Sequence, residues 1–158
     1  MRIAGSISKG LGYALALLMT AMVASVVWQV LSRYLFVVPA AWTEELARFL
    51  LIWIGMLGAA YAYRQGSHLG IDLLANKLSA SGQHKLHGVV HLVCLLFAVG
   101  VLIVGGGALM SLTWELKQYS AAIGLPIAYV YAVIPVSGIL IVLFAAEAML
   151  SGPEERVT

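Results

Sequence analysis

Hydrophobic residues fill four long stretches of the chain, separated by short polar segments. The stretches cover approximately residues 11–33, 41–63, 88–113 and 126–150. Because a spanning helix needs roughly 20 apolar residues, this pattern predicts four transmembrane helices. Arg2 and Lys9 precede the first stretch, as in a secretory signal. Its apolar run is longer than the roughly 7–15 residues of a signal, so we interpret it as a retained helix.

The longest polar segment, "RQGSHLGIDLLANKLSASGQHK", separates the second and third stretches. Within it Ile71, Leu74 and Leu78 recur at helical spacing, which predicts a short amphipathic helix lying in the membrane interface. In the fourth stretch Pro135 predicts a kink. In the third, the glycines of "GGG" at 105–107 predict the close approach of a neighbouring helix.

Composition supports this interpretation. The chain of 158 residues is 62% hydrophobic and 10% charged, whereas soluble domains are nearer about a quarter charged. The prediction is an all-α integral membrane protein, with residues 1–158 forming a single four-helix transmembrane domain. No polar segment is long enough to fold as a soluble catalytic domain, so we do not expect an enzyme. The net charge of +2 does not suggest nucleic acid as a partner.

Basic residues predict the orientation in the membrane, since cytoplasmic loops are enriched in lysine and arginine. An even number of helices puts both termini on one side. The termini and the middle loop hold Arg2, Lys9, Arg64, Lys77, Lys85 and Arg156, against Arg33, Arg48 and Lys117 in the other two loops. Both termini are therefore predicted to be cytoplasmic.

The second stretch has two dissimilar faces when it is drawn as a helix. One carries Glu44, Arg48, Leu51, Gly55, Gly58, Ala59 and Ala62, and the other carries Trp42, Phe49, Ile52, Trp53 and Met56. The large residues suit lipid or a bulky groove. Small residues let another backbone come close, which drives helix association in lipid.

Three charged residues lie near the start of this helix, at its predicted periplasmic end. Arg48 is spaced to pair with either Glu44 or Glu45. One interpretation is that these are ordinary interfacial charges that cap the helix. The other is that a charge cluster beside a small-residue face forms a docking surface for a partner.

Histidines raise the question of a metal or haem. His84, His87 and His91 share one helical face, but no cysteine or carboxylate lies near them in sequence to complete a site. A haem held between helices would need histidines on different spans at matching depth. We therefore predict no metal and no cofactor, and interpret these histidines as interfacial.

The remaining acidic residues of the hydrophobic stretches, Glu115 and Glu147, lie near helix ends, where we expect both to be solvated. The middles of all four stretches lack Asp, Glu, Lys, Arg and His. Transport coupled to protons or ions usually needs an ionisable group inside the membrane. The chain is therefore not expected to transport a substrate alone.

The segment "WTEELARFLLIWIGMLGAAYAYRQGSHLGIDLL" resembles the signature of the small (Q) membrane subunit, the DctQ family, of tripartite ATP-independent periplasmic (TRAP) transporters. The positions that carry the resemblance are Trp42, Glu44, Glu45, Arg48, Trp53, Leu57, Gly58, Ala59, Arg64, Gly66, His68 and Asp72.

The resemblance implies a bacterial inner-membrane protein that accompanies a large (M) membrane subunit. In this family a periplasmic binding protein delivers an organic acid, and the large subunit moves it, usually coupled to sodium. The small subunit is thought to brace the static part of the large one. The lack of interior charge, found independently, is what a bracing part would show.

Our hypothesis is that Glu44, Glu45 and Arg48 bond within the second helix and across to the large subunit, where they also help shape the platform for the binding protein. Together with Trp42, Trp53, Gly55, Gly58 and Ala59 they form the predicted partner interface. His68 and Asp72 are assigned to its cytoplasmic end, where they hold the loop helix against the bilayer or the partner.

Two other functions are possible for a small four-helix membrane protein. One is a haem- or quinone-binding membrane anchor of a respiratory enzyme, which the histidine placement argues against. The other is a small four-helix exporter. Such exporters carry a glutamate deep in their first helix, where this chain has only apolar residues and Gln29. The sequence does not identify the transported substrate.

Overall fold

The computed structural model describes residues 2–35, 41–65 and 80–150. Its elements are α1 (Arg2–Leu35), α2 (Ala41–Arg64), α4 (Ala80–Phe97), a π-helix η1 (Ala98–Gly105), α5 (Gly106–Glu115), α6 (Ile127–Tyr131) and α7 (Val133–Leu150). Four segments are long and apolar enough to cross a membrane: Gly5–Leu35, Ala41–Arg64, Gly88–Glu115 and Ile127–Ala148. The prediction of four spanning helices is confirmed. The predicted interfacial helix of residues 71–78 lies outside the described residues.

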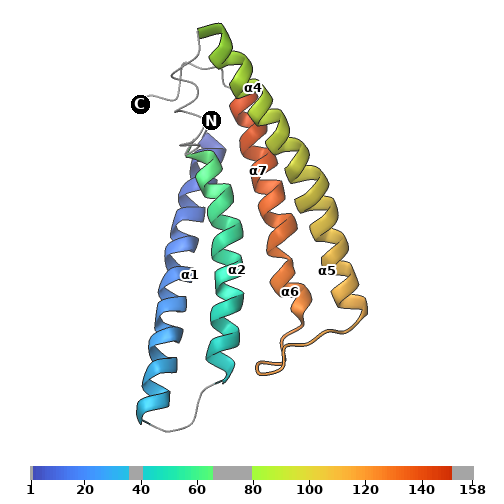
Figure 1. The fold of residues 1–158 in the computed structure, drawn as a ribbon. Helices are drawn as coiled ribbons and strands as arrows, with labels where there is room; N and C mark the ends of the chain where they lie inside the picture. The colour runs from blue at the N-terminus through green and yellow to red at the C-terminus, as the bar shows by residue number, and fades with distance from the viewer. Residues whose placement is uncertain (1, 36–40, 66–79, 151–158) are drawn as a thin grey trace.

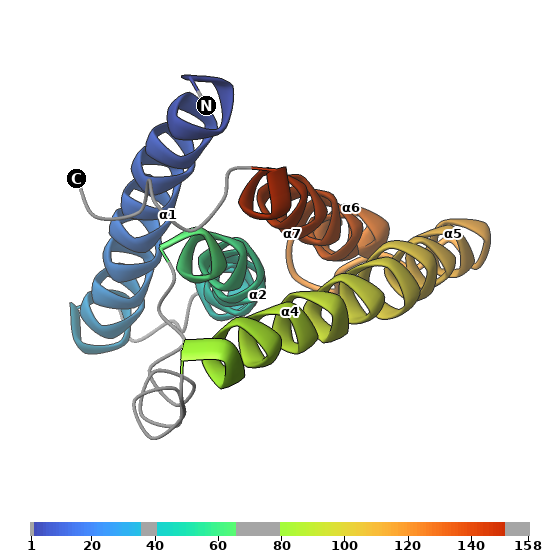
Figure 2. The same ribbon diagram turned by 90° about the horizontal axis from the view of Figure 1, so that it is seen from above.

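The helices are arranged around a central pair, α2 and α7 (Figures 1 and 2). Helix α1 packs on α2, and the third span, made of α4, η1 and α5, packs on α7. Among the described residues α1 makes no contact with the third span, so these two spans lie on opposite sides of the central pair. The start of α1 and the end of α7 lie at one end, the termini end (Figure 1). The opposite end, where the loop joins α5 to α6, is called the loop end.

The core of this row is small, as expected for a chain that is surrounded by lipid. It joins residues of α1, α2, η1 and α7, among them Leu11, Leu57, Ala60, Leu102 and Phe144. Most other large side chains of the spans are exposed, for example Leu17 at 72% and Val104 at 63%. Since hydrocarbon solvates such side chains well, their exposure favours a membrane environment and needs no further protein layer.

Glycine allows the third span to approach α7 closely. A Cβ atom placed on Gly106 would lie 2.6 Å from Cγ2 of Ile134, and one placed on Gly138 would lie 2.8 Å from Cβ of Leu102. The close approach predicted from the glycines at 105–107 is therefore confirmed at Gly106. Gly107 has open space around it, because it lies on another side of the same helix.

The fourth span is interrupted as Pro135 predicts. Helix α6 ends at Tyr131 and α7 begins at Val133, two residues before the proline. Proline lacks the N–H that would bond to the carbonyl of Tyr131. The next amide, that of Val136, donates a long hydrogen bond of 3.3 Å to the Ala132 carbonyl. The interruption brings Ile134 and Pro135 against Gly106.

Candidate functional site

One face of α2 is exposed along the whole helix. Its residues recur every three or four positions and are Ala41, Glu44, Arg48, Leu51, Gly55, Ala59 and Ala62. A Cβ atom added to Gly55 or to the half-buried Gly58 would have no neighbour within 4 Å. This exposed face of α2 is the small-residue face predicted from the sequence. Nothing in the described part of the chain covers it.

The large residues of α2 lie on the side of the helix that faces the rest of the chain. Ile52, Trp53 and Met56 are partly buried and pack against the core cluster, which includes residues of α1 and α7. The bulky groove expected for this face is therefore formed by the chain itself. Trp42 differs from them, because it is 47% exposed at the first turn of the helix. Of the two predicted interface tryptophans, Trp42 is the more exposed.

The two adjacent glutamates at the loop end have different partners. Arg48 donates a hydrogen bond to Oε1 of Glu44, one helical turn away. Both side chains of this ion pair are exposed, at 71% for Arg48 and 56% for Glu44. Such exposed pairs stabilise a helix only slightly. The pair therefore contributes little to the fold, and it lies on the exposed face of α2.

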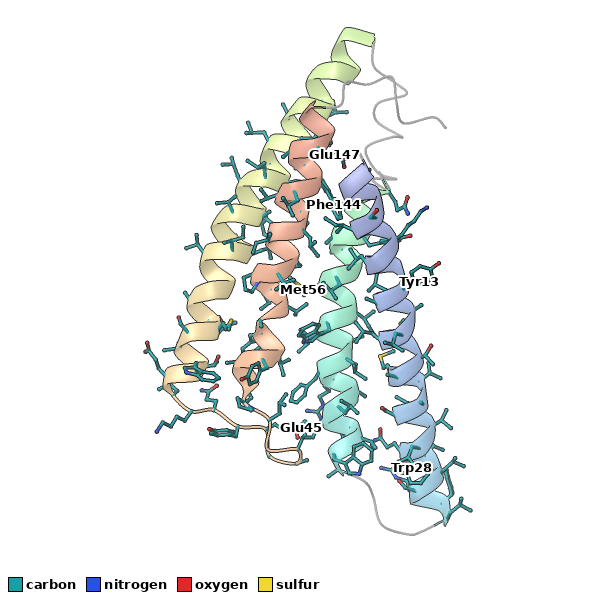
Figure 3. The ribbon with its side chains drawn as sticks, turned by 180° about the vertical axis from the view of Figure 1, so that it is seen from behind. Tyr13, Trp28, Glu45, Met56, Phe144 and Glu147 are labelled. Carbon is teal, nitrogen blue, oxygen red and sulfur yellow. The ribbon has the colours of Figure 1, made fainter. Side chains whose placement is uncertain are left out.

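Glu45 instead binds the loop between α5 and α6. Its carboxylate accepts hydrogen bonds from the backbone N–H groups of Ala121 at 3.2 Å, Ala122 at 2.8 Å and Ile123 at 3.2 Å. Consecutive N–H groups that converge on one point form a nest for an anion. Glu45 fills this nest and connects α2 to a segment more than 70 residues further along the chain (Figure 3).

The loop has a defined shape that presents these amides. An antiparallel bridge joins Tyr119 and Pro126, and the amide of Ser120 bonds to the Leu125 carbonyl at 2.9 Å. The turn also needs a positive φ at Gly124, where it is 73°, a conformation that glycine adopts without strain. The sequence thus forms a short closed turn, with Glu45 bound across its tip.

An ion pair at the termini end joins the two central helices. A guanidinium nitrogen of Arg64 lies 3.2 Å from a carboxylate oxygen of Glu147, and the Glu147 side chain is only 15% exposed. The same guanidinium lies 5.9 Å from the ring centroid of Phe144. The expectation that Glu147 is solvated is therefore wrong. The packing of α2 on α7 brings Arg64 to it, and this neutralises a carboxylate that would be costly alone.

Tyr63 connects α2 to the third span at the same end. Its hydroxyl lies 2.7 Å from Nδ1 of His91, and the two rings meet edge to face at 5.9 Å. No group of three potential metal ligands comes together in the part of the chain that the structure describes. His68 and the side chains of His84 and His87 lie outside that part.

The structure places most of the predicted interface residues but not all of them. Glu44, Arg48, Gly55 and Ala59 share the exposed face, while Glu45 and Trp53 contact the chain itself. His68 and Asp72 are outside the described residues. The Arg64–Glu147 and Tyr63–His91 pairs were not predicted from the sequence. The sequence held one signal for the first pair. Arg64 and Glu147 have opposite charges and lie at the ends of the second and fourth spans, on the same predicted side of the membrane.

Comparison with known proteins gives the family. Residues 22–153 match the family described as tripartite ATP-independent periplasmic transporters, DctQ component. The chain is 36% identical over 90 residues to the sialic acid TRAP transporter small permease protein SiaQ of Vibrio cholerae, a match that covers 56% of this chain and 51% of SiaQ. The chain thus spans about half the length of that relative.

Two further relatives cover more of this chain. A putative TRAP transporter small permease protein of Haemophilus influenzae is 30% identical over 112 residues, 71% of this chain and 68% of that protein. The isethionate TRAP transporter permease protein DctMQ of Oleidesulfovibrio alaskensis is 30% identical over 125 residues, 75% of this chain but only 20% of that longer protein.

The matched region contains all of α2, including Glu44, Glu45 and Arg48, the whole of the third and fourth apolar spans, and the part of the first span from residue 22 onward. The resemblance seen in the sequence between Trp42 and Asp72 is confirmed. Because the family match covers most of the chain and the structure supplies four membrane-spanning helices, the protein belongs to the DctQ family of TRAP transporter small permease subunits and is a multi-pass protein of the bacterial inner membrane.

Proposed function

We propose that this chain is a non-catalytic subunit that pairs with a large membrane subunit and braces it during sodium-coupled uptake of an organic acid. A periplasmic binding protein would deliver the acid and dock at the loop end. The observation that carries the proposal is the exposed face of α2. It combines small residues, Gly55 and Ala59, with the Glu44–Arg48 ion pair, and nothing in the described chain covers it.

The physical argument is that such a face fits a helix of another chain. Without a hydrophobic force between helices in lipid, association depends on close van der Waals contact and on polar bonds between helices. Gly55 and Ala59 permit the contact, and Glu44 with Arg48 can supply the bonds. A lipid-facing surface gains nothing from an ion pair, so this combination favours protein over lipid as the neighbour.

The relatives support the partner and the substrate class. The DctMQ protein contains a segment similar to this chain within a much longer permease, as expected if a large and a small part work together. Two relatives are named for the transport of sialic acid and of isethionate, which are both organic acids. The absence of ionisable residues from the middles of the spans also favours a supporting role over a transport path through this chain.

Co-purification tests the pairing. The tagged chain is expressed with its neighbouring genes and extracted in mild detergent, and a large hydrophobic subunit should elute with it in equal amount. Gly55→Leu and Ala59→Leu should reduce that yield, because a bulky residue separates the two helices. Ala24→Leu, at an exposed position of α1, is the matched control. Normal pairing in the Gly55→Leu and Ala59→Leu variants would show that this face is not the interface.

Transport requires a separate measurement. Proteoliposomes that contain both membrane subunits should take up the organic acid only when the binding protein and an inward sodium gradient are present. Vesicles with the large subunit alone should be inactive or quickly lose activity if this chain braces it. Equal and lasting uptake without this chain would refute the bracing role.

A further inference from the structure

Lys117 has an unusual backbone conformation at the loop end. It follows the last turn of α5 and has a φ of 49°. The amides of Lys117 and Gln118 bond to the carbonyls of Trp114 and Thr113, which is the Schellman arrangement that usually has glycine at this position. A lysine there is strained relative to glycine. Strain at a residue suggests that its side chain serves another purpose.

Lys117 is one of six residues that line a small open pocket. Thr113, Trp114, Lys117, Gln118, Tyr119 and Pro126 enclose a volume of about 140 Å³. The bridge between Tyr119 and Pro126 closes one part of the wall. Trp114 is held by an edge-to-face contact with Tyr129, with ring centroids 5.8 Å apart. The pocket is open to the outside and has room for a small polar group.

The pocket lies at the level of the membrane surface. Aromatic residues that mark such a level surround the loop end: Trp28 and Tyr34 on α1, Trp42 on α2, and Trp114, Tyr119 and Tyr129 around the α5–α6 loop. Figure 3 shows Trp28 and Glu45 at this end. Leu112, 52% exposed on α5, and Leu116, 59% exposed just after it, continue the surface toward the hydrocarbon. A ligand in the pocket would therefore have its polar part in water and its apolar part in the bilayer.

We propose that this pocket binds the phosphate of an anionic phospholipid, with Lys117 as its cation. Trp114 and Tyr119 would flank the headgroup, Gln118 would donate a hydrogen bond from its amide, and the acyl chains would lie along Leu112 and Leu116. The nearest acid in sequence, Glu115, is not among the lining residues. A bound lipid explains why a strained lysine occupies this turn. The proposal does not depend on the proposed function.

Native mass spectrometry of the full chain in mild detergent tests this. Phosphatidylglycerol is titrated against the wild type, Lys117→Gln, Lys117→Arg and Lys117→Gly. The control is Lys9→Gln, near the start of α1 at the termini end. Lys117→Gln and Lys117→Gly should bind about fivefold more weakly, the effect of one basic residue near an anionic lipid. Lys117→Arg and Lys9→Gln should bind like the wild type.

Two further measurements identify the ligand and test whether the variants fold. Phosphatidylcholine, which has no net charge, should bind more weakly than phosphatidylglycerol, and inorganic phosphate should not compete with the lipid. Lys117→Gly should melt at or above the wild-type temperature while it loses lipid, because glycine relieves the strained φ. Equal binding of phosphatidylglycerol by the wild type and Lys117→Gln would overturn the proposal, and so would full competition by inorganic phosphate.

Discussion

Arg64 near the end of α2 and Glu147 near the end of α7 form an ion pair at 3.2 Å that joins the two central helices at the termini end. Figure 3 shows Glu147 and Phe144 at this end, far from Glu45. Together with the bond from Glu45 to the α5–α6 loop, the pair holds α2 at both of its ends. The middle of the helix, where Gly55 and Ala59 lie, is thereby presented outward in a fixed orientation.

Removal of one member of this pair should destabilise the chain. Glu147→Ala leaves the Arg64 cation beside Phe144, and we expect a loss of about 1–3 kcal/mol, between the values for exposed and buried pairs. Unfolding by SDS in mixed micelles measures the change. The double exchange Arg64→Glu with Glu147→Arg should recover part of it. A loss no greater than that of Glu115→Ala, at an exposed acid, would contradict the assignment.

Glu45 should control the order of the α5–α6 loop. In Glu45→Ala the amides of Ala121, Ala122 and Ile123 lose their shared acceptor, so their hydrogen exchange should become faster, while exchange in α7 stays unchanged. Glu45→Gln keeps one acceptor oxygen and should be intermediate. Glu44→Gln, which changes the neighbouring acid that pairs with Arg48, should leave the loop as in the wild type. Faster loop exchange in Glu44→Gln would mean that the two acids are not separate in function.

Two neighbouring glycines of α5 should respond oppositely to the same substitution. Gly106→Ala places a Cβ atom 2.6 Å from Ile134 and should cost about 1–3 kcal/mol through overpacking. Gly107→Ala meets nothing within 4 Å and should be neutral or stabilise by up to about 1 kcal/mol through helix propensity. Thermal melting in detergent compares them. Equal effects would mean that the third span does not pack on α7 through Gly106.

Arg48 should matter for the partner more than for the isolated fold. If the Glu44–Arg48 pair becomes buried against a large subunit, Arg48→Ala leaves Glu44 uncompensated there, at a cost of about 3–5 kcal/mol to the complex. The large subunit should then be lost during purification, while the melting temperature of the chain alone barely changes. Arg33→Ala, at an exposed arginine of the same end, is the control. An intact complex with normal uptake would refute the role of Arg48.

The sequence predicted the features that depend on neighbours along the chain. Hydrophobic length defined the four spans, and the Pro135 ring broke the fourth. Helical spacing alone put Gly55 and Ala59 on one face and allowed Arg48 to pair with Glu44. It did not reveal that Glu45 turns away from Arg48, because its partners at Ala121–Ile123 depend on how the α5–α6 loop folds.

Contacts between spans also escaped prediction, because they depend on the order in which the helices pack. The sequence does not show that α2 packs mainly on α7, so the charges of Arg64 and Glu147 could suggest a pair but did not establish one. Nor does it show whether the large or the small face of α2 turns inward. Trp53 is partly buried against the core of its own chain, and its predicted contact with a partner stays a prediction.

The π-helix η1 sets the angular position of everything that follows it in the third span. Its wider turn takes in more residues than an α-helical turn, and deleting one residue between Ala98 and Gly105 would convert it toward regular α-helix. Each residue of an α-helix turns the chain by about 100°, so such a deletion would rotate Gly106 away from Ile134. The π-helix in the middle of the span thus fixes how far the second half of the span is rotated relative to the first half. This rotation lets the two halves face different neighbours.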